Sequence, residues 1–300
     1  MWWRFDIHIS WWELIKRTAR ETIDDGCLDL AAQLAYYFVL ALFPTLIFLV
    51  ALASFFPVAE VTDDVVRGMS GFTPPDVIQV ITDQMRRLSQ AGNGGLLTLG
   101  VFGALWSSSA AVAGLITALN QAYDVPEGRA WWKVRIIAIL LTIALAFFLL
   151  ISSTLIIAGP AIAERLASTF GIASVVVWTW QILQWPVALI FVMTGVSLVY
   201  YFGPDVEQEW VWITPGALLA TLLWLGVSFG FRVYVNSFGN YNETYGALGA
   251  MIVLLLWLYL SGFAILVGAE LNAEIEHSSP HGKAPGEKYP GQRPHGEATR

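Results

Sequence analysis

Six long stretches of this chain contain no aspartate, glutamate, lysine or arginine, and they constrain its fold more than any other feature. An α-helix rises about 1.5 Å per residue, so about 20 residues are needed to cross the roughly 30 Å hydrocarbon core of a bilayer. Each stretch is long enough for one crossing. The stretches are Leu30–Ala59, Leu88–Tyr123, Ile136–Ala163, Leu166–Pro204, Trp210–Phe231 and Thr244–Ala269.

The sequence therefore predicts an all-α, polytopic membrane protein with six transmembrane helices between residues 30 and 271. An even number of spans places both chain ends on the same side of the membrane. Trimmed to their most apolar parts, the expected helices are Leu30–Phe56, Leu96–Leu119, Val134–Ala158, Val175–Tyr201, Ile213–Val235 and Ala247–Leu271.

The composition agrees with a bilayer environment and argues against several classes of function. Charged residues make up only 13% of the chain, and the mean hydropathy is +0.61, whereas soluble domains carry about 25% charged residues. A formal net charge of −7 argues against a nucleic-acid partner, because phosphate contacts require clustered lysine and arginine. The single cysteine, Cys27, excludes an intrachain disulfide and a cysteine-based zinc site.

The distribution of basic residues predicts the orientation of the chain. Cytoplasmic segments of membrane proteins carry an excess of lysine and arginine, and cytoplasmic termini give such an excess here. The outer loops then hold only Arg67, Arg86, Arg87 and Arg165, and Arg232 lies within a span. The inner segments hold Arg4, Lys16, Arg17, Arg20, Arg129, Lys133, Arg135, Lys283, Lys288, Arg293 and Arg300.

Three segments outside the spans have patterns of their own. Residues 1–29 form an N-terminal cytoplasmic segment, in which 11–27 have the pattern of an amphipathic interfacial helix with basic residues facing headgroups. The first outer loop, 57–94, repeats apolar residues at helical spacing and predicts two short amphipathic helices. Residues 272–300 are rich in proline, glycine and histidine, which predicts a cytoplasmic, mostly disordered tail.

Polar residues at the cytoplasmic ends of the spans are candidates for lining a cavity. Gln33 and Tyr37 share one face of the first span, because residues four apart lie one above the other. Asn120 ends the second span, and Glu270 and Asn272 end the last. These residues either line a cytoplasmic vestibule or make ordinary interhelical hydrogen bonds and headgroup contacts.

Pro44, Arg232 and Glu243 are candidates for gating. Pro44 lies in the middle of the first span, where its ring removes a backbone hydrogen bond and bends the helix, so it marks either a hinge or a packing kink. Arg232 and Glu243 flank the outer end of the fifth span. Either they pair and hold the outer loop closed over a substrate path, or Arg232 extends to the outer headgroups.

Several motifs of enzymes are missing from the sequence. It contains no Gly-x-x-x-x-Gly-Lys phosphate loop and no His-Glu-x-x-His helix. The four histidines are His8, His277, His281 and His295, all near the termini, so they do not form a metal cluster within the spans. We therefore expect a protein that is not an enzyme, with no catalytic, cofactor-binding or metal-binding residues.

Four stretches carry a family resemblance that covers about residues 10–276. Leu30-Ala-Ala-Gln-Leu-Ala-Tyr-Tyr-Phe-Val-Leu-Ala-Leu-Phe-Pro44 resembles the first span of the YihY/BrkB family of bacterial inner-membrane proteins. Tyr245–Leu260, followed by Gly268-Ala-Glu-Leu-Asn-Ala-Glu274, resembles the closing signature of that family. Ala118–Tyr123 and Thr214–Ala217 match its middle landmarks.

The resemblance implies a six-helix protein of the bacterial inner membrane with both termini in the cytoplasm. Members have carried the label ribonuclease BN, a tRNA-processing name, and others are called virulence factors or serum-resistance proteins. Transport or lipid handling has been suggested for some. The loop before the fifth span is usually basic in the family and is acidic here, and 109–114 lack an arginine often present there, which argues against an anionic ligand at the cytoplasmic face.

Three functions follow from these observations as hypotheses. The first is transport or handling of a lipid-like or small amphiphilic molecule, with the lipid bilayer as the environment. The alternative is a membrane scaffold or envelope-assembly factor, whose partner is a second copy of the chain or an envelope protein. A tRNA-processing ribonuclease is the least favoured, because cleavage requires a metal or a positioned acid and base near a basic groove.

Overall fold

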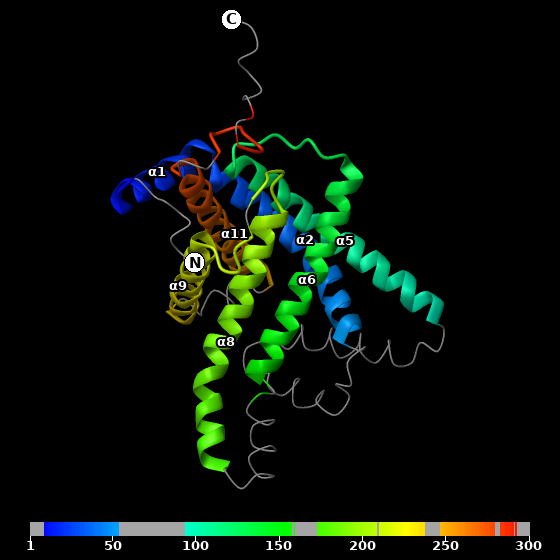
Figure 1. Ribbon diagram of the computed structural model, residues 1–300. Coiled ribbons are helices and arrows are strands. Elements are labelled where there is room, and N and C mark those ends of the chain that lie inside the picture. Colours follow the sequence, from blue (N-terminus) through cyan, green and yellow to red (C-terminus); the bar gives the residue numbers. More distant parts are fainter. Residues whose placement is uncertain are drawn as a thin grey trace, which may run out of the picture. The chain divides into compact units, whose positions relative to one another are not determined.

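The computed structural model is helical and contains no strand over the residues that it describes, which are 9–53, 94–157, 159, 173–208, 210–237, 247–279, 283–290 and 292 (Figure 1). The predicted all-α fold class is confirmed. The helices are α1 (Trp11–Asp24), α2 (Cys27–Ala53), α5 (Gly94–Ala122), α6 (Trp131–Ile157), α8 (Ala173–Phe202), α9 (Pro215–Ser237) and α11 (Ala247–His277).

Six of these helices, all except α1, are long and apolar enough to cross a membrane. They are built mainly from leucine, alanine, isoleucine, valine and phenylalanine, so every side of the helix tolerates lipid or a neighbouring helix. Pro44 lies inside α2 and Pro186 inside α8, as proline is tolerated within membrane helices. The predicted six-spanning membrane protein is confirmed.

Most helix boundaries lie within three residues of the predicted ones, and the differences at the turn before α2 and at the end of α11 have clear reasons. Gly26 adopts a φ of +65°, which ends the amphipathic helix at Asp24 and lets α2 begin at Cys27, before the first fully apolar stretch. The last helix continues to His277 rather than ending at Leu271, because its polar final turns pack against other parts of the chain. The two short helices expected in the outer loop lie outside the described residues, because of 57–94 the structure describes Gly94 alone.

The helices group into two compact units, which are described separately. The first comprises 1–40, 110–141 and 196–300, and the second comprises 41–109 and 142–195. Helices α2, α5, α6 and α8 contribute to both. In the second unit, Phe48, Ala104 and Ala146 form a buried apolar cluster, and the rings of Phe148 and Phe191 pack with centroids 5.9 Å apart.

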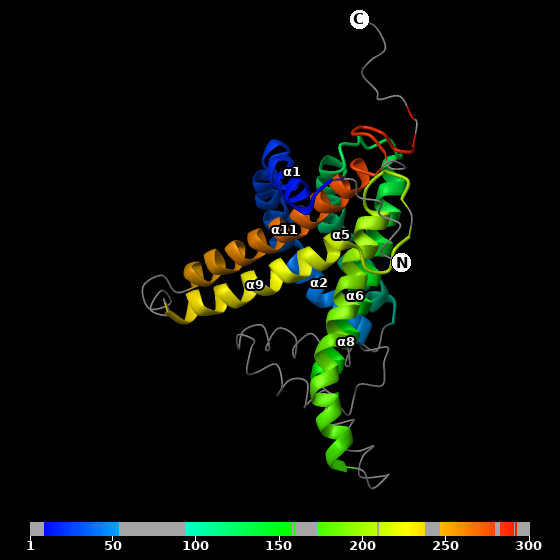
Figure 2. The same cartoon turned by 60° about the vertical axis from the view of Figure 1, so that its left-hand side comes forward.

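In the first unit, α9 and α11 run side by side (Figure 2), and two glycines allow their backbones to approach closely. A Cβ on Gly216 would lie 1.9 Å from the carbonyl oxygen of Gly268. A Cβ on Gly268 would lie 2.5 Å from the hydroxyl of Tyr200 on α8, which donates a hydrogen bond to the carbonyl of Ile265 at 2.5 Å. Only glycine fits at this crossing.

A polar network joins the loops that follow α5 and α8 in the chain. Arg129 contacts the Glu127 carboxylate at 2.7 Å and donates to the carbonyl of Gly203 at 2.7 Å. Asp205 accepts a hydrogen bond from the backbone of Gly128 at 3.0 Å and also forms an ion pair with Lys288. Two separate loops and the chain after α11 are therefore held together by charge.

The segment 283–290 differs from the predicted mostly disordered tail. Besides the Lys288 ion pair, the backbone of Glu207 donates to the carbonyl of Lys288 at 2.7 Å. Lys283, which is 4% exposed, contacts the carboxylate of Glu276 and the carbonyl of Glu207. Composition did not reveal this docking, because its partners Asp205 and Glu207 lie about 80 residues away in the sequence.

We predict that Gly216→Ala destabilises the protein, whereas Gly226→Ala on the same helix does not. The new methyl group at position 216 meets backbone oxygen, and overpacking of this kind costs about 1–3 kcal/mol. A Cβ at Gly226 meets nothing within 4 Å. Thermal unfolding of the two variants in one detergent measures the difference, and equal unfolding temperatures would contradict the tight crossing.

We also predict an acid-dependent loss of stability that depends on Glu127. Partial burial would raise the pKa of this carboxyl, but the hydrogen bonds from Arg129 and Asn120 outweigh burial and lower its pKa from 4.5 to about 2. A depressed pKa stabilises the folded state above the unfolded value, and this contribution is lost as the pH falls from 4.5 towards 2.

Glu127→Gln should therefore be less stable at neutral pH by about 1 kcal/mol, and its unfolding temperature should fall less steeply than that of the wild type as the solution is acidified. The control is Glu13→Gln, which removes an exposed ion pair with Arg17 and should leave the slope of the wild type unchanged. Parallel slopes for Glu127→Gln and the wild type would refute the assignment.

Candidate functional site

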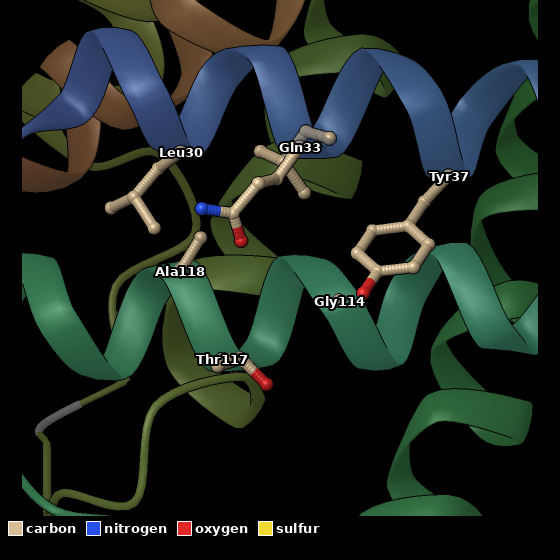
Figure 3. Close-up of a pocket in the computed structure, with 7 residues that line it drawn as sticks. Leu30, Gln33, Tyr37, Gly114, Thr117 and Ala118 are labelled. Carbon is tan, nitrogen blue, oxygen red and sulfur yellow. The ribbon is translucent and has the colours of Figure 1, made fainter.

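A pocket opens between α2 and α5 within the first unit (Figure 3). Its volume is about 70 Å³, which is room for a small chemical group rather than for a whole ligand, since one water molecule occupies about 30 Å³ of liquid. The pocket is lined by Leu30, Gln33, Leu34, Tyr37, Gly114, Thr117 and Ala118.

Helix periodicity and two small residues create this pocket. The lining positions on α2 follow one another three or four residues apart, so they share one helix face. On the opposite side, Gly114 and Ala118 lie four residues apart on α5 and remove side-chain bulk from the contact. A Cβ on Gly114 would lie 2.7 Å from the ring of Tyr37, so the ring occupies the space that glycine leaves.

The polar groups of the pocket are neutral and lie among apolar neighbours. Gln33 and Thr117 are exposed, and Tyr37 is 40% exposed. In Figure 3 the amide of Gln33 and the ring of Tyr37 extend from α2 towards α5. The Thr117 hydroxyl donates to the carbonyl of Ala113 at 3.2 Å, which leaves its oxygen able to accept. Such a lining can hydrogen-bond an uncharged or zwitterionic group.

Glu270 lies outside this pocket, in a buried contact between α11 and the turn that joins α1 to α2. It is 1% exposed and accepts a hydrogen bond from the Cys27 thiol at 3.2 Å. The Asp25 carboxyl lies close enough to Glu270 to interact with it electrostatically. Gln121 of α5 donates to the backbone carbonyl of Asp25 at 2.8 Å, which ties the same turn to a third helix.

The electrostatics around this turn are acidic. Burial, together with the nearby charge of Asp124, raises the pKa of Asp25 to about 6. Burial also raises the pKa of Asp124, which the charge of His277 opposes. Over the described part of the chain, no group of histidine, cysteine and carboxylate side chains is arranged to hold a metal ion.

Asn120 has a structural position at the end of α5. It is 4% exposed, its amide donates to Glu127 at 2.9 Å, and its carbonyl accepts from the backbone of Asp205 at 2.7 Å. Both ends of the side chain are thus engaged in the loop network.

Asn272 occupies a similar position on α11. Its carbonyl accepts from the backbone N–H of Gly216 at 2.8 Å, and its amide donates to the Thr214 hydroxyl at 3.0 Å. The first N–H groups of a helix have no partner within the helix, so Asn272 satisfies one of them at the start of α9. The Tyr123 hydroxyl is hydrogen-bonded to the same side chain, and burial raises its pKa.

Of the seven candidate residues that the structure describes, Gln33 and Tyr37 lie together in one pocket. Pro44 lies inside α2 beyond the pocket lining, and Arg232 is exposed on α9. Glu243 lies outside the described residues, so its pairing with Arg232 stays a prediction.

Sequence reasoning assigned no role to Gly114 and Thr117, nor to the contact of Asp25 and Cys27 with Glu270. Small residues four apart, as in Gly114 and Ala118, were the available signal for a close helix contact. The polar partners were not detectable, because they come from helices far apart in the sequence.

The sequence also contains the letters of a nucleophile elbow, Gly226-Val-Ser-Phe-Gly230. An elbow requires a sharp turn between a strand and a helix that exposes the serine. Here the five residues lie inside α9, and Ser228 accepts a hydrogen bond from the Trp257 indole at 3.3 Å. This context argues against a nucleophilic role for Ser228.

Comparison with known proteins places the chain among bacterial membrane proteins. It is 38% identical over 256 residues to the putative ribonuclease-like protein YfkH of Bacillus subtilis, covering 85% of this chain and 92% of that protein. It is 29% identical over 258 residues to UPF0761 membrane proteins of Xanthomonas oryzae and Xanthomonas campestris, of whose length it spans 59%. No solved structure matches the chain.

The family match covers nearly the whole chain. Residues 18–292 match the sequence profile described as virulence factor BrkB, a range that includes all six membrane-spanning helices. The chain is therefore a member of the virulence factor BrkB family of membrane proteins.

Proposed function

We propose that this membrane protein transports or presents a lipid-like or small amphiphilic molecule, and that the pocket between α2 and α5 holds the polar part of that molecule. The observation that carries the proposal is a set of exposed, neutral hydrogen-bonding side chains, Gln33, Tyr37 and Thr117, on spanning helices that are mainly apolar. Polar groups on spanning segments are costly unless they meet a partner. A ligand with hydroxyl, amine or zwitterionic groups supplies one.

The size of the pocket favours an amphiphile over a compact solute. About 70 Å³ accommodates part of a headgroup, so the rest of the ligand lies outside it. The outward side of α2 next to the pocket is apolar, with Tyr36 59% exposed and Leu40 57% exposed. An acyl chain can remain in contact with this surface and with lipid while the headgroup enters the pocket.

The charges near the pocket favour a ligand without net negative charge. The lining contains no charged side chain, and the acidic turn at Asp25 lies at the start of α2. Carboxylates repel phosphate and other anions at short range. A zwitterionic or amine-bearing headgroup is therefore favoured over an anionic one.

We further propose that the protein resides in the bacterial inner membrane with both termini in the cytoplasm. The excess of lysine and arginine in the inner segments supports this orientation, and the named relatives come from bacteria. The pocket, which lies near the start of α2, then faces the cytoplasmic leaflet.

RNA cleavage is the second candidate, because the Bacillus subtilis relative is named ribonuclease-like. A nuclease must attract a polyanion, whereas the buried carboxyl of Glu270 lies near the acidic residues Asp25 and Asp124. Incubating the purified protein with tRNA tests this directly. Cleavage that is abolished by Glu270→Gln would favour the nuclease over the lipid proposal.

We predict that the reconstituted protein accelerates the movement of a fluorescent phosphatidylethanolamine between the leaflets of phosphatidylcholine vesicles. Gln33→Leu removes a hydrogen bond worth about 1 kcal/mol and should slow this movement about fivefold. Gly114→Ala should have at least a similar effect, because its methyl group displaces the Tyr37 ring. Loss of fluorescence after adding dithionite, which bleaches only the outer leaflet, measures the rate.

The matched control is Gly103→Ala on α5, where a Cβ meets nothing within 4 Å. This variant should behave like the wild type and shows that an extra methyl group on the helix is harmless. If wild-type protein neither binds the fluorescent lipid nor moves it faster than in protein-free vesicles, the proposed function is wrong.

The orientation is tested separately with fusions to the C-terminus. Green fluorescent protein folds in the bacterial cytoplasm, and alkaline phosphatase is active only after export to the periplasm. We expect bright fluorescence from the first fusion and background activity from the second. The reverse result would place the C-terminus outside and the pocket in the other leaflet.

A further inference from the structure

Helix α1 has four distinct rows of side chains, which follow from its four-residue repeat. Leu14, Thr18 and Thr22 form one row and are buried, at the contact of α1 with α11. Next to it lies a row that is entirely apolar and exposed. It consists of Trp11, Ile15, Ala19 and Ile23, with Trp11 67% exposed and Ile23 72% exposed.

The neighbouring row combines an aromatic ring with two basic groups. Trp12 is 66% exposed, and the Lys16 ammonium lies 5.6 Å from the centre of its ring. Arg20 follows one turn later and pairs with the exposed carboxylate of Asp24 at 3.2 Å. The exposed apolar row is thus bordered by α11 on one side and by Lys16 and Arg20 on the other.

The place of α1 in the chain decides what covers this surface. Only Asp25 and Gly26 separate α1 from α2, the first membrane-spanning helix. With 14 residues, α1 is too short to span a bilayer, which requires about 20. It therefore lies next to the start of α2 (Figure 1), where α2 enters the membrane. Glu270 and Gln121 hold the connecting turn in place through hydrogen bonds with Cys27 and Asp25.

We propose that the exposed side of α1 is a docking surface for the anionic headgroup layer of the bilayer. The apolar row inserts between headgroups and acyl chains, and tryptophan and isoleucine are suited to this depth. Lys16 and Arg20 contact the phosphates that border the inserted row, an arrangement worth about a fivefold gain in binding for each basic residue. This surface is separate from the α2–α5 pocket and does not depend on the function proposed for it.

The charges on the remaining row explain why the attraction is local. Arg17 is paired with Glu13 at 3.3 Å. Burial raises the pKa of Glu21, and the nearby charges of Glu274 and Asp124 also raise it, so Glu21 lies near other acidic groups. The acidic groups of α1 other than Asp24 are thus on the side away from the apolar row. Helix α1 has three acidic and three basic residues. Two of the basic residues, Lys16 and Arg20, border the apolar row.

Spin labels on the full-length protein in lipid nanodiscs test the proposal. In a Cys27→Ser background, which keeps a donor to Glu270, a nitroxide is placed at Ile15→Cys, Ile23→Cys or, on the opposite side, Arg17→Cys. Labels at 15 and 23 should collide readily with oxygen and rarely with an aqueous nickel complex, whereas the label at 17 should show the reverse. Immersion at 15 and 23 should deepen when phosphatidylglycerol replaces part of the phosphatidylcholine.

Charge variants separate headgroup recognition from apolar insertion alone. Lys16→Gln combined with Arg20→Gln should remove the effect of phosphatidylglycerol, and the control Arg17→Gln should keep it. If the labels at 15 and 23 were in water both with and without phosphatidylglycerol, the proposal that this surface docks on the bilayer would be wrong. If their immersion did not depend on lipid charge, the proposed recognition of anionic headgroups would be wrong. Protection that increases with the number of protein copies per disc would assign this surface to a second copy and overturn the proposal.

Discussion

The structure depends on one constraint, which is that backbone polar groups within hydrocarbon must be hydrogen-bonded by the chain itself. Six apolar stretches satisfy it by forming helices, and their residues face lipid or one another with little penalty. Because lipid provides no hydrophobic force for helix association, contacts between these helices depend on close fit. The crossing of α9 and α11 through Gly216 and Gly268 is such a contact.

Many of the hydrogen bonds that join described elements lie at helix ends and in the loops of the first unit. Asp205 belongs to a loop whose acidic residues lack basic neighbours in the sequence, and the fold supplies Arg129 and Lys288 from two other segments. Glu270 meets Cys27 across the turn between α1 and α2. Because these groups are engaged with one another, Gln33, Tyr37 and Thr117 stand out as the polar side chains that face outward into a pocket.

Much of the fold was predictable, and much less of the candidate site. The spans were predictable because hydrocarbon requires long apolar runs, and Gln33 and Tyr37 were placed on one face because helix geometry is regular. Asn120 and Glu270 are buried and Asn272 is partly buried, and each is hydrogen-bonded to partners of its own, which is the second of the two alternatives that the sequence left open. Their shared depth along the chain resembled a common cavity, but depth alone does not specify which direction a side chain faces around its helix.

The sequence by itself determined the solvent of this protein, its helical class and the approximate limits of its spans, because each depends on local composition over about 20 residues. Only the tertiary structure decided that Gly114 makes room for Tyr37, that Asn272 caps α9, and that Lys288 reaches Asp205. Those contacts join residues 56 to 83 positions apart. They depend on the rotation and spacing of packed helices, which no local pattern of residues specifies.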